Sequence, residues 1–215
     1  MLLQPFRLAR TTLADDDGIP VHGLRWVEAI ARCNTMSADA GLTPAYDLTG
    51  ARVAWDPSAD GFRLPTEAEW EHACRAGSDA PVSAPLERCA WTAIDAVDGP
   101  QPVAGKEPNG LGLHDMLGNL WEWCWDYADP ARYADYRSLR GGGWADRPFS
   151  VRAGVRRGTA PDATLEDVGV RVAQGAVADP GAAAAQGWSA AADRERAAIR
   201  GPLPIGWTPL RDLLA

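Results

Sequence analysis

The chain has 215 residues, enough for one well-packed domain with a tail or for two very small domains. Its formal net charge of −8 argues against nucleic acid as a partner, because phosphate binding needs a basic face. No early segment has the pattern of a signal peptide or a membrane span, so we expect a cytoplasmic protein that does not engage a membrane.

Two helices and a hairpin are predicted in the first third of the chain. Apolar residues recur at helical spacing between Leu24 and Gly41, which predicts the first helix. The runs AYDL and RVAW flank a Thr-Gly turn and predict a small hairpin. In TEAEWEHACRAG, Thr66 and Glu69 have the spacing of a capping box, which predicts the start of a second helix.

The middle of the chain combines loops with alternating strand patterns. Residues 78–112 are rich in Pro, Gly, Ala and Asp and predict mostly loop, with short strands at 89–91 and 101–105. In GNLWEWCWD (118–126) tryptophan recurs at every second position, so in an extended segment the indoles would line one side and the glutamate the other. SVRAGVRR and VGVRVA, with apolar and arginine residues in alternation, predict further strands.

The composition changes after residue 174. GAVADPGAAAAQG is alanine-rich and of low complexity, and it indicates a linker or a weak helix. SAAADRERAAIR predicts a helix, and Trp207 and Leu210 are candidate docking residues near the end. We therefore divide the chain into a domain at 1–174 and an alanine-rich linker with a C-terminal extension at 175–215.

Four sequence blocks carry a family resemblance. FRLPTEAEWEHACRAG, NGLGLHDMLGNLWEWCWD, LRGGGW and VRAGVRRGTAPDATLEDVGVRVA occur in this order. They resemble the formylglycine-generating enzyme family, also called the sulfatase-modifying-factor family, over about residues 18–174. The resemblance implies an α+β, C-type-lectin-like fold with much irregular structure. It also implies a structural calcium ion held by the carbonyls of Leu117, Gly118 and Leu120 and the carboxylate of Glu122.

Glu122 has two open interpretations. A carboxylate on the inward side of an extended segment needs a cation or strong donors, and calcium takes shells of carboxylate and carbonyl oxygens. The alternative is a salt bridge to one of the many arginines. The family's other calcium site is not carried over, because residues 88–108 show no matching ligands.

The segment after the glycine triplet departs from the enzymes of the family. Those enzymes are expected to hold copper(I) there on two cysteines, since this soft metal prefers sulfur ligands. GGGWADRPFSVRAG contains no cysteine, so formylglycine generation by that mechanism is not expected. The four cysteines, which have no paired or zinc-like spacing, are expected to be buried thiols. They are Cys33, Cys74, Cys89 and Cys124.

Other branches of the family suggest other metals. Some relatives are similar to sulfoxide synthases, whose iron is held by histidines of a separate domain. Here His22, His72 and His114 are far apart and lack that pattern, so the spacing gives no support to bound iron or copper. The region before IPVHGLRW is also short for the family, so part of the usual core edge is expected to be missing. The C-terminal tail, a second copy in an oligomer or a partner subunit would then cover this edge.

Two functional hypotheses from different classes follow. The first is a binding module, because the segment after the triplet is similar to the variable proteins of diversity-generating retroelements, which present a C-type-lectin surface. Its ligand would be a peptide, a protein or a small anion bound by the 144–158 surface. The residues expected to form that surface are Trp144, Ala145, Asp146, Arg147, Phe149, Ser150 and Arg156. The second hypothesis is a metal-dependent oxidoreductase acting in a biosynthetic or protein-modification pathway.

The arginines of the same region have two interpretations. A functional interpretation, an anion-accepting surface, is kept for Arg147 and Arg156. For Arg152 and Arg171 we expect pairing with nearby carboxylates that holds irregular loops in place. The run of three glycines lacks the GK[ST] sequence of a phosphate loop, so nucleotide binding is not expected.

Overall fold

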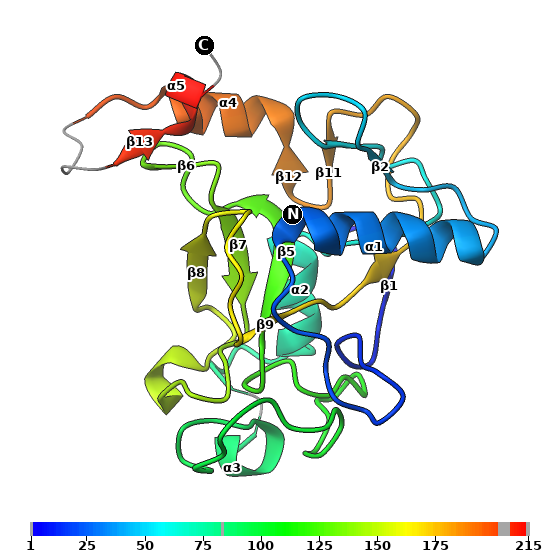
Figure 1. Cartoon of the computed structure of the whole chain (residues 1–215). Coiled ribbons are helices and arrows are strands. Elements are labelled where there is room, and N and C mark those ends of the chain that lie inside the picture. Colours follow the sequence, from blue (N-terminus) through cyan, green and yellow to red (C-terminus); the bar gives the residue numbers. More distant parts are fainter. Residues whose placement is uncertain (1, 83, 202–206, 214–215) are drawn as a thin grey trace.

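The computed structural model describes residues 2–82, 84–201 and 207–213 (Figure 1). Its centre is a four-stranded sheet of order β8-β7-β5-β9. The longest strand, β5 (Trp121–Tyr127), pairs antiparallel with β7 (Arg137–Arg140) and parallel with β9 (Val168–Gly169). β8 (Arg156–Thr159) pairs antiparallel with the other edge of β7.

Two longer helices pack on this centre. The first, α1 (Trp26–Asp39), and the second, α2 (Glu67–Arg75), lie close to the two predicted positions. The predicted capping box at the start of α2 is confirmed: the Thr66 hydroxyl accepts from the Glu69 N–H at 3.2 Å, and the Glu69 carboxylate accepts from the Thr66 N–H at 3.0 Å. This satisfies two donors that a helix start leaves without partners.

Smaller elements surround the central sheet. A three-stranded sheet has the order β1-β10-β4, and three two-stranded sheets pair β2 with β3, β11 with β12, and β13 with β6. Their bounds are β1 Arg7–Leu8, β2 Tyr46–Asp47, β3 Ala54–Trp55, β4 Phe62–Arg63, β6 Tyr133–Ala134, β10 Ala173–Gln174, β11 Ala184–Ala185, β12 Trp188–Ser189 and β13 Thr208–Pro209. The helices that complete the set are α3 Leu86–Cys89, α4 Ala190–Ala198, α5 Leu210–Leu213 and the 3-10 helix η1 Pro148–Ser150. The pairing of β2 with β3 confirms the predicted hairpin.

The alternation along β5 sorts its side chains as predicted. Trp121, Trp123 and Trp125 belong to the larger hydrophobic core, on the α1 side. Two of their indoles anchor irregular chain: Trp121 Nε1 donates to Asp146 at 2.7 Å, and Trp123 Nε1 donates to the Leu24 carbonyl at 2.9 Å. Glu122 points to the opposite side, where it meets α2 and a second buried cluster. A fold with short strands thus gains rigidity from large apolar surfaces that each carry one directed N–H.

The short strands predicted at 89–91 and 101–105 are wrong. Residues 86–89 form α3, whose closing bond runs from the Ala90 N–H to the Leu86 carbonyl at 2.8 Å. In 101–105 the N–H groups go to isolated acceptors, as when Gln101 donates to the Asn119 side chain at 2.9 Å. No neighbouring strand is therefore needed to satisfy this backbone.

The segment after residue 174 differs from the expected linker. Residues 184–189 form the β11–β12 hairpin, and the predicted helix that follows is α4. Gln186 is buried, and its side-chain amide donates to the Glu69 carboxylate at 2.7 Å. Its backbone carbonyl accepts from the Thr66 hydroxyl at 2.7 Å. Further on, Leu210 is buried and the Trp207 ring lies 4.5 Å from that of Tyr133, as expected of docking residues. The described helices include none that is long and apolar enough to cross a membrane.

Candidate functional site

The glycine triplet fixes the backbone from which the candidate loop emerges. Gly141 and Gly142 have φ of +105° and +87°, a region that L side chains rarely adopt. A Cβ on Gly142 would lie 2.8 Å from Cγ2 of Val151, so the chain crosses directly beneath the following loop. The Trp144 N–H then donates to the Asn119 carbonyl at 2.8 Å. The loop therefore starts from a rigid base.

Asp146 holds the loop to this base. One oxygen of its carboxylate accepts from Trp121 Nε1 at 2.7 Å and from the Gly143 N–H at 2.8 Å. The Asp146 carbonyl accepts from the Ala93 N–H at 2.9 Å. Asp146 was predicted as a recognition residue, but these contacts use its carboxylate inside the protein, where it stabilises the loop conformation.

The outer part of the loop is free for contact. Phe149 is 66% exposed on η1, and Ala145 and Arg147 are exposed beside it in the chain. The structure gives Arg147 no ion pair with any described residue. Trp144 and Ser150 are half-buried, and Trp144 Nε1 has no acceptor among the described residues. An aromatic ring and a guanidinium thus project from a fixed loop.

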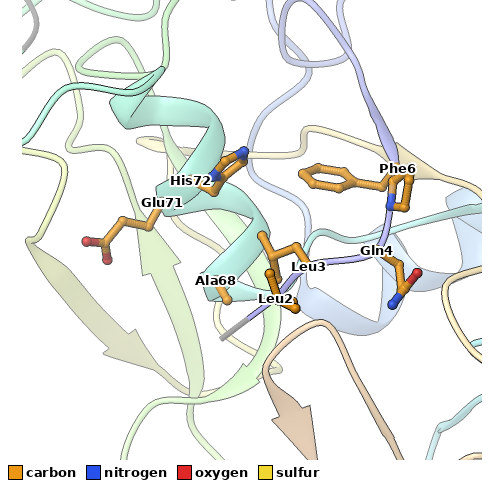
Figure 2. A pocket seen from close by; sticks show the side chains of 8 residues that line it. Leu2, Leu3, Gln4, Phe6, Ala68, Glu71 and His72 are labelled. Carbon is orange, nitrogen blue, oxygen red and sulfur yellow. The ribbon is translucent and has the colours of Figure 1, made fainter.

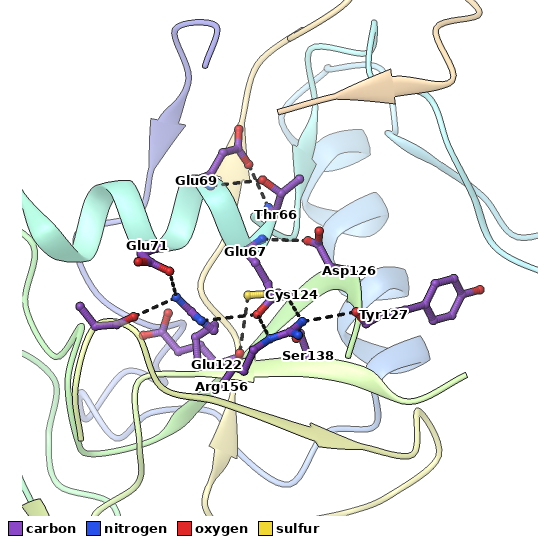
Figure 3. Close-up of polar contacts among 12 residues, drawn as sticks. Thr66, Glu67, Glu69, Glu71, Glu122, Cys124, Asp126, Tyr127, Ser138 and Arg156 are labelled. Carbon is purple, nitrogen blue, oxygen red and sulfur yellow. Dashed lines mark hydrogen bonds and ion pairs between the residues drawn. The ribbon is translucent and has the colours of Figure 1, made fainter. Parts of the chain in front are cut away.

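Arg156 lies elsewhere and is already paired. Its guanidinium forms a two-pronged ion pair with Glu67, the first residue of α2, with one contact of 2.9 Å, and it donates to the Ser138 hydroxyl at 3.0 Å (Figure 3). Glu67 also approaches Arg140, which pairs with Glu71 at 2.5 Å. The functional interpretation kept for Arg156 gives way to a structural one. The sequence did contain a sign of this pairing: Glu67 and Glu71 are four residues apart on α2, so both carboxylates lie on one face of the helix, where arginines can pair with them.

Of the two arginines expected to pair with carboxylates, Arg152 is exposed and forms no ion pair with a described residue, so the prediction is wrong for it. Arg171 is completely buried against Glu122, which confirms the structural interpretation for this residue. Arg157, which was not singled out, pairs with Asp167 at 3.2 Å. Arg156 and Arg157 border a hollow of about 370 Å³ whose opposite wall includes Tyr133 and Tyr136. Residues 144–150 do not line this hollow, so the predicted 144–158 surface has two separate parts.

The geometry at Glu122 favours the arginine alternative over calcium. Its two oxygens accept from Arg171 Nη2 at 2.7 Å, from Arg171 Nε at 3.0–3.1 Å and from Trp70 Nε1 at 2.7 Å. A calcium ion on the same oxygens would lie next to a guanidinium, so this donor set does not fit the ion. The calcium ligand set with Leu117, Gly118 and Leu120 stays a prediction of the resemblance, and no mechanism is derived from it.

The four cysteines are free thiols; Cys33, Cys74 and Cys124 are buried as expected, whereas Cys89 is only half-buried. Burial raises the pKa of Cys33 and of Cys74 to about 12 and that of Cys124 well above its usual range. Cys74 and Cys124 belong to the buried cluster under the loop, together with Val151. Metal binding requires thiolates, which these pKa values disfavour. Within the described ranges no three His, Cys, Asp or Glu side chains are grouped so that they could hold a metal ion.

Another hollow lies away from the loop. It measures about 760 Å³ and separates the N-terminal segment from α2 (Figure 2). Leu2 and Phe6 lie on one side and His72 on the other, while Glu71 points away and pairs with Arg75 and Arg140. Its wall is thus mainly apolar, with no convergent set of catalytic groups.

The fold and the four sequence blocks define a class of protein. The model of the sulfatase-modifying factor enzyme 1-like domain matches residues 3–176, and the chain belongs to this family. The solved structure of Treponema denticola variable protein 1 superimposes with a TM-score of 0.68 and 30% identity, over 74% of this chain and 72% of that one. The mixed α+β fold of the family is therefore confirmed.

Curated relatives in the family differ in activity. The chain is 32% identical to the inactive C-alpha-formylglycine-generating enzyme 2 of Mus musculus, over 64% of this chain and 52% of the relative. It is 32% identical to the formylglycine-generating enzyme of Streptomyces coelicolor, over 64% and 58%. It is 34% identical to the hercynine oxygenase of Mycobacterium tuberculosis, over 60% and 35%. The chain thus spans less than two thirds of the length of each.

Proposed function

We propose that the chain is a binding module of the sulfatase-modifying-factor family that takes a peptide or a small anionic ligand on the outer part of its 144–158 surface. The observation that carries this proposal is the exposure of Phe149 and Arg147 together on a loop fixed by Asp146 and the glycine triplet. A rigid loop lowers the backbone entropy that is lost on binding, and aromatic and arginine side chains dominate recognition surfaces.

The chemistry of the chain supports binding over formylglycine generation. The segment that follows the glycine triplet has no cysteine, and the buried thiols beneath it have raised pKa values. The relative named an inactive formylglycine-generating enzyme gives a precedent in the family for the loss of that activity.

Selection from a library of random 12-residue peptides tests the proposal. We expect selected peptides to be rich in Asp and Glu and to bind the Arg147→Ala and Phe149→Ala variants at least about tenfold more weakly, the loss typical of a hot-spot residue. Leu48→Ala is the matched control, because Leu48 is an exposed apolar side chain directly after β2 and outside the loop. Equal affinity of wild type and both loop variants would refute the assignment of the surface.

A second candidate, a metal-dependent oxidoreductase, is favoured by the hercynine oxygenase relative. The described residues give it little support, because no three of their His, Cys, Asp or Glu side chains are grouped so that they could hold a metal ion. Metal analysis of the purified protein separates the candidates. Stoichiometric iron or copper would support the oxidoreductase, whereas calcium alone would support the predicted structural ion and the binding module.

A further inference from the structure

Arg137 is a buried cation that forms no ion pair with any residue the structure describes. It is 7% exposed on β7, and its one hydrogen bond to a described residue runs from Nη1 to the Trp125 carbonyl at 2.6 Å. Its Nε has no acceptor in that same part of the chain, and no described carboxylate comes within ion-pair distance. The three other buried arginines, Arg63, Arg140 and Arg171, each pair with a glutamate at 2.5–2.7 Å.

The surroundings of Arg137 hold it in place without neutralising it. Its guanidinium lies 3.8 Å from the ring centre of Trp26, 4.0 Å from that of Tyr127 and 5.1 Å from that of Trp125. Burial lowers the pKa of Arg137. Aromatic faces attract a cation, but they replace only part of the hydration that it loses. The stacked guanidinium therefore retains N–H groups that can still bind an anion.

A cavity of about 180 Å³ adjoins this guanidinium, between the central sheet and the C-terminal segment. Arg137, Trp125 and Tyr127 form its floor, and residues of α4, α5 and β12 form its roof. The apolar lining comes from Val53, Trp125, Trp188 and Leu210. The cavity is smaller than the sites of drug-sized ligands, which measure about 300–1,000 Å³.

The charges around the cavity favour an anion. Arg52, Arg137 and Arg194 line it, against one carboxylate, Asp193. Asp193 is already engaged, since it accepts from Trp188 Nε1 at 2.8 Å and pairs with Arg196 at 2.5 Å. The lining therefore carries an excess of positive charge within a chain whose formal net charge is −8.

We infer that this cavity binds a small carboxylic acid with an apolar or aromatic body. The carboxylate would accept from the free N–H groups of Arg137, and the body would pack against Trp125, Trp188 and Leu210. An arginine fork matches the geometry of a carboxylate, and pairing would remove the cost of the uncompensated buried charge. The site lies at the α4–α5 end of the molecule, whereas the loop with η1 is at the opposite end (Figure 1). The inference is therefore independent of the proposed peptide surface.

Titration of the full chain with benzoate tests the inference, with neutral benzamide as the matched probe. We expect saturable binding of benzoate, measured by calorimetry and by the change in tryptophan fluorescence from Trp125 and Trp188. Benzamide should bind at least about tenfold more weakly than benzoate, because a loss of this size corresponds to one charge-assisted hydrogen bond. Failure of benzoate to bind, or equal binding of benzamide, would overturn the inference.

Three variants locate the site. Arg137→Met should weaken benzoate binding at least about tenfold, because it removes the anion partner while keeping an apolar stem. Arg194→Glu changes an exposed residue at the rim, so the fold is kept and the reversed charge should also weaken binding. Arg152→Met is the control, since Arg152 is exposed and lies outside the cavity lining. Benzoate affinity that is unchanged in Arg194→Glu would contradict the site, even if Arg137→Met did not fold.

Discussion

Replacement of Glu122 by Gln measures how much of this fold depends on a buried ion pair. The two oxygens of Glu122 take three N–H groups, two from Arg171 and one from Trp70, and both charged side chains are fully buried. Gln would keep the shape but turn an NH₂ group toward a guanidinium that then has no counter-charge. Breaking a buried pair in this way typically costs about 3–5 kcal/mol.

That cost is large enough to be read from thermal unfolding. For a chain of this size, 1 kcal/mol corresponds to roughly 2–4 °C in Tm, so Glu122→Gln should lower Tm by about 6–20 °C. The control is Glu28→Gln, whose partner Arg25 is exposed like Glu28 itself, and whose Tm should stay close to that of wild type. Arg171→Met should cost a similar amount, and combining it with Glu122→Gln should cost less than the sum, since no buried charge is left alone.

The same measurement in EDTA separates the two interpretations of Glu122. If Arg171 satisfies the carboxylate, Glu122→Gln lowers Tm equally with and without the chelator. If calcium satisfies it, EDTA destabilises the wild type and removes most of the difference between the two proteins. A Tm for Glu122→Gln within about 2 °C of wild type would refute the reasoning from the ion pair.

Three further predictions concern the backbone, the tail and pH. Gly118→Ala should unfold far more easily than Gly18→Ala in urea, because both glycines have positive φ but a Cβ at Gly118 would lie 2.2 Å from a carbonyl oxygen, whereas Gly18 has open space; equal midpoints would contradict this. Gln186→Ala should cost about 1–3 kcal/mol in chemical denaturation, because it removes the side-chain hydrogen bonds to the buried Glu69 and to the Gln4 backbone; a neutral effect would show that the hairpin is only loosely held. Burial and repulsion from Glu67 raise the pKa of Asp126 from its ordinary 3.8 to about 7, so the native state keeps a proton that the unfolded chain releases, and this carboxyl makes stability fall as pH rises from about 4 to 7. Asp126→Asn should therefore raise Tm relative to wild type more at pH 8 than at pH 4, and the same shift at both values would contradict the assignment.

The sequence correctly predicted those elements that depend on contacts between residues close together in the chain. The capping box at Thr66 and Glu69 is a contact between residues three apart, so its sequence pattern is nearly the structure itself. The alternation along β5 likewise fixed which side each tryptophan faces, because successive side chains on a strand point to opposite sides. The wrong strands at 89–91 and 101–105 lacked such a constraint: residues 86–89 form the short helix α3, and Gln101 donates to Asn119, 18 positions away.

The candidate site was predicted only in part, for a related reason. Exposure of Ala145, Arg147 and Phe149 agrees with the expected recognition face. The role of Asp146 depends on Trp121, and that of Arg156 depends on Glu67, which lies 89 positions away in the chain. An arginine in a strand has the same local pattern whether it binds a ligand or a buried glutamate, so the sequence could not separate the two.

The pairing of the arginines also indicates where ligands should be sought in this protein. A buried guanidinium is costly unless an anion accompanies it, and the structure supplies glutamates for Arg63, Arg140 and Arg171 from within the chain. The pairs of Arg63 and Arg140 join β4 and β7 to α2, and that of Arg171 joins the segment after β9 to β5. Arg137 is the exception: its Nε has no acceptor among the described residues, and it lines a cavity that the C-terminal segment covers. Because the charge of Arg137 has no carboxylate partner in the described part of the chain, a bound acid would also stabilise the docking of α4 and α5, and occupancy should slow amide exchange in α4 without changing it in the loop at 144–150.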